Sequence, residues 1–305
     1  MQIPHKITSE DRTAKIKDRA ARFVHISGLP LGQGGLMNLT QFWDNKDEQP
    51  LDRIVNDGGM CAIFRKIACI GDSLSSGEFE GKAADGQKSY HDMFEYSWGQ
   101  YIARAAGNTV YNFSRGGMTA KEYCDAFAKK LGLWDKEKAC QAYIIALGVN
   151  DITRAMANKE QLGGTDDVNI GDWRKNKPTF AGYYAMIIQR IREIQPKARI
   201  FLVTLPHSCR EAEREVYEDR HRELLYDFSK LFEYTYVVDL RKYAPVYDDE
   251  FKDRFYLGGH MNPMGYIFTA KIIASYIDYI IRHNYDDFRQ VGFIGTDYCN
   301  ADYKR

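Results

Sequence analysis

Residues 66–76 of this 305-residue chain read KIACIGDSLSS. The run from Lys66 to Ile70 is short and mostly apolar and ends at Gly71, a pattern typical of a buried parallel strand followed by a sharp turn. Asp72 and Ser73 then fall at the carboxyl end of that strand, the edge where open parallel sheets bind ligands. A serine there either caps a helix or places its hydroxyl in a cleft, and this stretch alone leaves both interpretations open.

The same pattern of strand and turn recurs along the chain, with helical periodicity between the strands. Strands are expected at 66–70, 109–113, 142–147, 199–205 and 236–240, and helices at about 94–106, 119–131, 179–195, 210–232 and 263–282. Strands that alternate with helices indicate right-handed parallel βαβ units. The predicted fold is therefore α/β, a three-layer sandwich around a five-stranded parallel sheet. The polar stretches 76–92 and 241–259 are interpreted as loops.

Three segments are expected from the composition along the chain. Residues 63–285 should form the α/β domain, residues 1–62 an N-terminal extension that packs on it, and residues 286–305 a C-terminal tail. The extension is charged in its first 24 residues and rich in glycine after them, and it carries no recognisable chemistry.

Charge and cysteine usage narrow the classes of function. Lys+Arg and Asp+Glu are equal at 42 each, so no overall field favours nucleic acid or an acidic membrane surface. No membrane span is expected, since no stretch approaches the roughly 18 apolar residues that one needs. The six cysteines form no metal-binding spacing and are interpreted as reduced thiols. The amino terminus has no apolar signal-peptide core, which favours a cytoplasmic protein, or a secreted or periplasmic one if a signal was removed.

Three of the predicted strands end in polar turns that contain glycine. These turns are Gly71–Ser73, Gly116–Gly117 and Gly148–Asp151. Because parallel strands end at the same edge of a sheet, the three turns should meet at one cleft. A serine nucleophile beside glycine N–H groups and an Asn amide suits acyl transfer, with the donors placed for a developing oxyanion. A base is also required, because serine is a weak nucleophile at its free pKa.

Four short blocks of the sequence resemble the signature of the SGNH/GDSL hydrolase family. They are Gly71-Asp-Ser73-Leu, Asn112-Phe-Ser-Arg-Gly-Gly117-Met-Thr, Gly148-Val-Asn150-Asp and Gly259-His260-Met-Asn262. The blocks come in the family's order and the resemblance covers about residues 63–283. It implies a flavodoxin-like sheet and a serine esterase that needs no metal or cofactor.

The resemblance also implies a role for each matching residue. Ser73 would be the nucleophile and His260 the general base. The N–H groups of Ser73 and Gly117 and the side chain of Asn150 would form the oxyanion hole, with Gly116 as the alternative glycine. Within the family we favour a short acyl group on a polar alcohol, such as an acetylated carbohydrate, over the lysophospholipase and thioesterase alternatives.

One position departs from the family pattern. The family usually has Asp three residues before the histidine, where this chain has Leu257. A catalytic imidazole needs an acceptor for the N–H on its other nitrogen. Asp253 and a main-chain carbonyl near Leu257 are the two candidates, and we favour the carbonyl because Asp253 lies between Lys252 and Arg254, a pattern typical of a solvated surface.

Two further residues and one rival function complete the sequence-based predictions. Asp72 is expected to brace its turn, and His207 is expected to be a loop residue with a structural role. The rival is a non-catalytic module that binds a phosphate or nucleotide at residues 71–77. Against it, Glu78 stands where a phosphate-binding P-loop needs Lys. The sequence predicts a small ester substrate as the partner and gives no indication of the oligomeric state.

Overall fold

The computed structural model describes residue 43 and residues 45–303. The chain divides into two units, Met1–Asn45 and Lys46–Arg305, and the strands found among the described residues lie in the second. Most of the predicted N-terminal extension, residues 1–42 and 44, lies outside the described residues.

A five-stranded parallel sheet forms the centre of the second unit. Its strands are β1 (Lys66–Gly71), β4 (Thr109–Ser114), β5 (Ala142–Ala146), β6 (Arg199–Val203) and β7 (Thr235–Val238). They are ordered β4-β1-β5-β6-β7, and each neighbouring pair is parallel. This is the flavodoxin-like order 2-1-3-4-5, and it confirms the predicted α/β fold.

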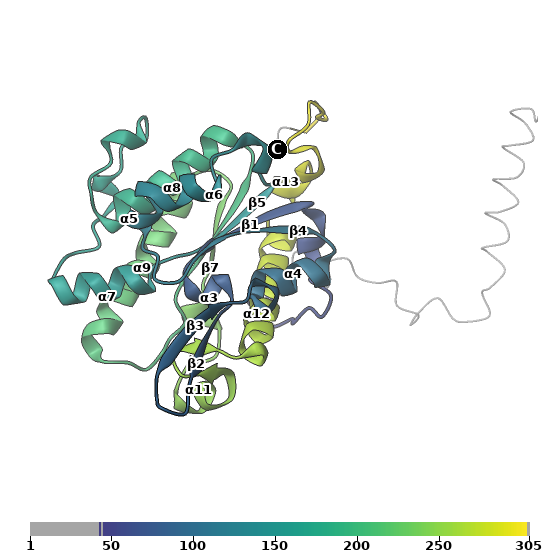
Figure 1. Ribbon diagram of the computed structural model, residues 1–305. Coiled ribbons are helices and arrows are strands. Elements are labelled where there is room, and N and C mark those ends of the chain that lie inside the picture. Colours follow the sequence, from purple (N-terminus) through teal and green to yellow (C-terminus); the bar gives the residue numbers. More distant parts are fainter. Residues whose placement is uncertain (1–42, 44, 304–305) are drawn as a thin grey trace, which may run out of the picture. The chain divides into compact units, whose positions relative to one another are not determined.

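Helices cover both faces of the sheet and make it a three-layer sandwich (Figure 1). One face is covered by α5 (Ala120–Glu122), α6 (Ala128–Leu131), α7 (Val149–Asn158), α8 (Phe180–Ile194) and α9 (Ala212–Leu231). The other is covered by α4 (Trp98–Ala106), α12 (Pro263–His283) and α13 (Tyr285–Phe288). The shorter helices are α3 (Ser73–Ser76), α10 (Leu240–Tyr243) and α11 (Asp249–Phe255).

Alternation along each strand sends side chains into two separate cores. Ala68 and Ile70 of β1 belong to the core under α5–α9, whereas Ile67 and Cys69 belong to the core under α4 and α12. Because both faces are covered, β1 reads as the continuous apolar run from which it was predicted. All six cysteines are free thiols.

The interpretation of residues 76–92 and 241–259 as loops is wrong, because both segments contain secondary structure. Within residues 76–92, β2 (Glu78–Lys82) and β3 (Lys88–Asp92) form an antiparallel hairpin. The hairpin is almost entirely polar, and Phe79 is its one large side chain packed on the core, against Tyr266. Such a strand gives little hydrophobic periodicity to detect. Residues 241–259 likewise contain α11 and β8 (Tyr256–Leu257), which pairs with β9 (His260–Met261).

Other departures are small. The predicted helix 119–131 has a π-helical segment, Tyr123–Phe127, between α5 and α6. Short 3₁₀ turns occur at Gly59–Ile63, Phe94–Tyr96, Lys136–Lys138, Thr165–Asp167, Trp173–Lys175 and Val291–Phe293.

The described end of the predicted extension packs on α12. The Val55 N–H donates to Ser275 Oγ (2.9 Å), and Arg282 forms a buried ion pair with Glu48 (2.5 Å). The α12 helix is long and apolar enough to cross a membrane, but 72% of its most apolar window is buried in the protein. It therefore has the character of a core helix, held at its start by the Asn262 side chain, which accepts from the Gly265 N–H (2.9 Å).

Candidate active site

The nucleophile candidate Ser73 stands directly after the central strand β1. Gly71 ends the strand where a Cβ would lie 2.2 Å from Ser75 Oγ, so only glycine fits. Asp72 caps the one-turn helix α3 by accepting the Leu74 N–H (3.1 Å), which confirms its predicted bracing role. Burial raises the pKa of Asp72 to about 7. Ser73 is the first residue of α3 and is half-buried at the carboxyl edge of the sheet.

The two strands beside β1 bring the expected oxyanion-hole residues to the same edge. Gly71 pairs with Ser114 of β4 on one side and with Ala146 of β5 on the other. Gly117 follows β4 with φ of 75°, a left-handed conformation that favours glycine, and Asn150 follows β5 in the first turn of α7. The structure therefore brings Ser73, Gly117 and Asn150 to three adjacent strand ends.

Asn150 is tied to the loop that carries Gly117. Its Nδ2 donates one hydrogen bond to the Met118 carbonyl (3.1 Å). An amide nitrogen has two protons, so the second remains for a substrate oxygen. The next residue strengthens the same junction, because Asp151 Oδ1 accepts the Ala120 N–H (2.9 Å). Burial raises the pKa of Asp151 to about 7.

His260 reaches the site from a different kind of element. It lies on the two-residue strand β9, opposite Leu257 of β8, across a turn in which Gly258 has φ of 64°. Asn262 holds this segment by donating to the Arg254 carbonyl (2.8 Å). The rings of Tyr90 and His260 make an edge-to-face contact, with 5.6 Å between their centroids.

Two carboxylates of β2 flank the imidazole, and the sequence analysis missed both. Glu78 Oε1 lies 3.0 Å from His260 Nε2, and Glu80 Oε2 lies 3.8 Å from Nδ1. Burial raises the pKa of Glu78 above its ordinary value. A hydrogen bond from Lys88 lowers the pKa of Glu80. The signal in the sequence was the pair of acids two residues apart after the nucleophile, which a strand places on one face.

Three predicted positions can be compared with these contacts. Within the described residues no hydrogen bond links His260 to Ser73, to Asp253 or to a main-chain carbonyl, and His260 Nδ1 is buried without a hydrogen-bond partner. Asp253 is exposed on α11. His207 pairs with Glu215 (3.2 Å), and its carbonyl accepts the Tyr247 N–H (2.7 Å), contacts of the loop after β6.

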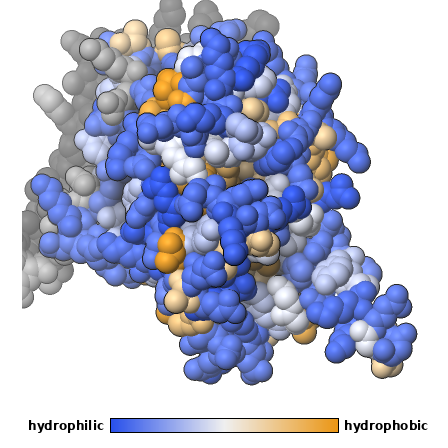
Figure 2. All heavy atoms as spheres, turned by 90° about the vertical axis from the view of Figure 1, so that its left-hand side faces the viewer, coloured by the Kyte–Doolittle hydropathy of each residue, from blue (hydrophilic) through white to orange (hydrophobic). Residues whose placement is uncertain are grey.

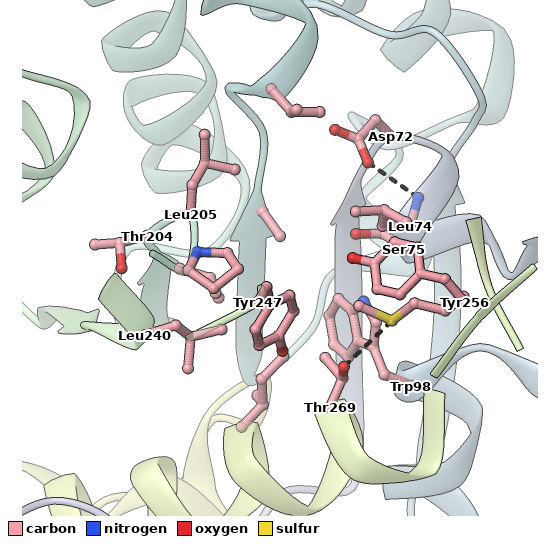
Figure 3. A pocket seen from close by; sticks show the side chains of 16 residues that line it. Asp72, Leu74, Ser75, Trp98, Thr204, Leu205, Leu240, Tyr247, Tyr256 and Thr269 are labelled. Carbon is pink, nitrogen blue, oxygen red and sulfur yellow. Dashed lines mark hydrogen bonds between the residues drawn. The ribbon is translucent and has the colours of Figure 1, made fainter. Parts of the chain in front are cut away.

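A small cavity of about 70 Å³ lies against the nucleophile turn (Figure 3). Asp72, Leu74 and Ser75 form one wall, and Leu205 and Tyr247 stand across from them. Neither Ser73 nor His260 lines it. The cavity therefore adjoins the residues on either side of Ser73, and it is not the place where an ester meets the nucleophile. In the described part of the chain no cluster of three or more His, Cys, Asp or Glu side chains is arranged to hold a metal ion.

The chain was compared with known families and structures. The model of the GDSL-like lipase/acylhydrolase family matches residues 69–267, which include the nucleophile turn, both glycine-containing turns and His260. No curated protein matches the chain in sequence.

Several solved structures share the fold. A family two carbohydrate esterase from Clostridium thermocellum, solved in complex with cellohexaose, is 18% identical with a TM-score of 0.52, and the match covers 71% of this chain and 64% of that one. A protein from Lactobacillus plantarum is 16% identical with a TM-score of 0.50, covering 72% and 98%. An acetyl xylan esterase is 18% identical with a TM-score of 0.44, covering 70% and 99%. At these identities the likeness concerns the fold.

Proposed function

Because the chain belongs to the GDSL-like lipase/acylhydrolase family and is a hydrolase of ester bonds, we propose that its substrate is a short acyl ester of a neutral, polar alcohol, such as an acetylated carbohydrate. The reaction passes through an acyl-serine. The observation that carries the substrate class is the acidic hairpin β2–β3, whose carboxylates border the imidazole.

The proposed chemistry uses the residues gathered at the strand ends. Ser73 Oγ attacks the ester carbonyl while His260 takes the hydroxyl proton. The oxyanion is stabilised by the N–H groups of Ser73 and Gly117 and by the free Nδ2 proton of Asn150. Collapse expels the alcohol, which receives the proton from His260, and leaves an acyl-serine. A water activated by the same imidazole then releases the acid and restores Ser73.

In this structure His260 Nε2 faces Glu78 rather than Ser73. Catalytic hydrogen bonds are often long or misaligned in a free enzyme and tighten when substrate binds. The proposal therefore requires the imidazole to turn from Glu78 toward Ser73 in the substrate complex.

The charge around the imidazole favours a neutral substrate. Glu78, Glu80 and Asp92 all come from the hairpin, and Lys88 is the hairpin cation that pairs with one of them, Glu80 (2.6 Å). An anionic group placed beside such carboxylates meets like-charge repulsion of several kcal/mol. Phospholipids, acyl carriers with phosphate groups and esters of uronic acids are disfavoured on this ground, whereas neutral sugars and polyols are not.

An exposed aromatic ring beside the base and a largely hydrophilic molecular face agree with a sugar alcohol as substrate. Tyr90 is 54% exposed beside His260 and offers a flat aromatic surface next to the base. Figure 2 shows one face of the molecule as mainly hydrophilic, with apolar side chains in separate small spots. A structural neighbour with the same fold is a carbohydrate esterase bound to cellohexaose, which is consistent with this class.

The substrate class is tested with two matched series. The first is p-nitrophenyl esters from acetyl to dodecanoyl, for which we expect kcat/KM to be highest with the acetyl ester and to fall as the chain lengthens. The second compares an acetylated methyl glucoside with the acetylated methyl glucuronide, for which we expect the neutral sugar to be the better substrate. A preference for octanoyl or longer chains, or for the glucuronide, would overturn the proposal.

A further inference from the structure

The hairpin places one carboxylate beside each nitrogen of the catalytic imidazole. Glu78 and Glu80 are two residues apart on β2, so their side chains leave the same face of the strand. The Oε1 atom of Glu78 lies 3.0 Å from His260 Nε2, and the Oε2 atom of Glu80 lies 3.8 Å from Nδ1. All three side chains are largely buried.

Glu80 is built into the loop that carries the histidine. Its Oε2 accepts the Gly259 N–H (2.9 Å), and Lys88 of the facing strand lies 2.6 Å from its Oε1. A Cβ on Gly258 would lie 2.4 Å from the same carboxylate, so the turn passes directly over it. The hydrogen bond from Lys88 holds the pKa of Glu80 below its usual range. Glu80 is therefore a fixed, ionised group against the turn before His260.

The position from which the family supplies an acid holds none here. Leu257 occupies it and is 51% exposed, and among the described contacts no hydrogen bond or ion pair joins Asp253 to the imidazole. His260 Nδ1 is nevertheless buried and lacks a hydrogen-bond partner among the described residues. Glu80 is the carboxylate beside that nitrogen, with 3.8 Å between its Oε2 atom and Nδ1. A small movement that shortens this distance to ~3 Å would form a hydrogen bond between Glu80 and the imidazole.

We propose that Glu80 replaces the missing family aspartate and acts as the positioning residue of the base. It accepts the Nδ1 proton of His260, fixes the tautomer with Nε2 as the basic nitrogen, and stabilises the imidazolium that forms when Ser73 gives up its proton. This inference rests on the esterase mechanism proposed above, but not on the choice of substrate.

Glu78 has a different position relative to the reacting atoms. It contacts Nε2, the nitrogen that must receive the serine proton, and its carboxylate also lies against Gly116, where a Cβ would be 2.3 Å away. A hydrogen bond to Glu78 therefore competes with the bond from Ser73. Glu78 must release Nε2 before each turnover. It therefore holds the imidazole in the free enzyme and does not assist proton transfer.

The central test compares two isosteric substitutions on one strand with p-nitrophenyl acetate as substrate. Glu80→Gln should lower kcat by about 10² to 10⁴-fold with KM nearly unchanged, as when a triad aspartate is made neutral. Glu78→Gln should change kcat by less than about tenfold, because it takes the charge from a group that competes with Ser73 for Nε2 and removes no group that assists the base. A larger loss for Glu78→Gln than for Glu80→Gln would overturn the assignment.

The pH profile separates positioning from simple support of the loop. The charged and titratable groups around His260 are Glu78, Glu80 and Tyr90, with Asp92 beside Glu78 and Lys88 beside Glu80. Removing the charge of Glu80 makes the imidazolium less stable, so the acidic limb of the kcat profile should move to lower pH in Glu80→Gln. Glu80→Asp, which keeps the charge, should retain the wild-type limb and part of the activity.

Two control variants complete the experiment. Lys88→Met removes the cation that anchors Glu80 but leaves the carboxylate, and it should cost less than about tenfold in kcat. Asp253→Asn, the alternative acid, should also cost less than about tenfold. The inference fails if either control loses as much as Glu80→Gln, or if Glu80→Gln keeps more than about a tenth of the wild-type kcat while circular dichroism shows an intact fold.

Discussion

Ser73, Gly117 and Asn150 stand at the ends of three adjacent strands, whereas His260 stands on a two-residue strand at the start of α12. The first group is positioned by the register of a buried sheet and by hydrogen bonds between side chains and the backbone at its edge. The base is positioned by side chains of a hairpin that lies 179 residues earlier in the chain, through the contact between Glu80 and the Gly259 N–H.

From this difference we expect the two sides of the site to tolerate change differently. A strand end cannot move without disturbing the sheet, so a residue at one of the three turns has little freedom to be replaced from another position. The base needs only an acceptor at the correct place, and any nearby carboxylate of suitable geometry can supply it. The loss of an acid at Leu257 is compatible with a working base for that reason.

The largest loss of turnover is expected from a substitution at one of the strand ends. Ser73→Ala removes the nucleophile and should lower turnover of p-nitrophenyl acetate by roughly 10³-fold or more, leaving only the contribution of the oxyanion hole and binding. Labelling by a fluorophosphonate probe should disappear in the same variant. More than about a tenth of wild-type turnover in Ser73→Ala would remove Ser73 from the mechanism.

Asn150→Ala tests the second strand end and should have the next largest effect. Loss of one oxyanion donor is expected to lower kcat by about 10²–10³, roughly 2.7–4 kcal/mol, with KM little changed because the amide bonds the transition state more strongly than the ground state. Steady-state kinetics on the acetyl ester measure both constants. A rise in KM at constant kcat would instead make Asn150 a substrate-binding residue.

A carboxylate at a second position should be able to replace Glu80 beside the catalytic base. Leu257 lies directly opposite His260 in the β8–β9 pair, and such residues have Cβ atoms about 4.5–5.5 Å apart on one face. An aspartate at this exposed position can therefore approach the ring. In the Glu80→Gln background, Leu257→Asp should restore kcat by about tenfold or more, and in the wild-type background it should change kcat by less than about threefold.

A second double variant is the control for this recovery of activity. Leu257→Asn in the Glu80→Gln background has the same shape without the charge and should restore little. Equal recovery with Asn and Asp would show that the polarity of the turn, rather than a carboxylate for the imidazole, limits the activity of Glu80→Gln.

Much of this arrangement was accessible from the sequence, and the physical reason differs between the two sides. The five strands are largely apolar runs, and three of them lead into turns that contain glycine, so their ends could be predicted. The parallel topology then brought Ser73, Gly117 and Asn150 together. The hairpin was missed because its residues are nearly all polar and show no apolar alternation beyond Phe79. Nothing local in the sequence connects Glu80 with Gly259, since that contact depends on tertiary packing between distant segments.

The smallest expected effect concerns the stability of the turn that carries the nucleophile at the end of β1. Asp72 is fully buried, and burial raises its pKa to about 7. In the unfolded chain its pKa is about 3.9. Between these values the folded state binds more protons than the unfolded state, so the free energy of unfolding falls as pH rises. The contribution is fully present below about pH 4 and is lost as pH rises through about 7.

Asp72→Asn removes this titration and keeps the cap, because the amide oxygen can still accept the Leu74 N–H. The stability of the variant relative to wild type should therefore rise between pH 5 and pH 8, by on the order of 2–3 kcal/mol. Urea unfolding at several pH values measures this difference, and Asp253→Asn on the exposed face of α11 serves as the matched control, with no pH-dependent change expected. A constant difference between Asp72→Asn and wild type across this range would mean that Asp72 is ionised throughout. The turn would then hold a charged carboxylate beside the nucleophile in spite of its burial.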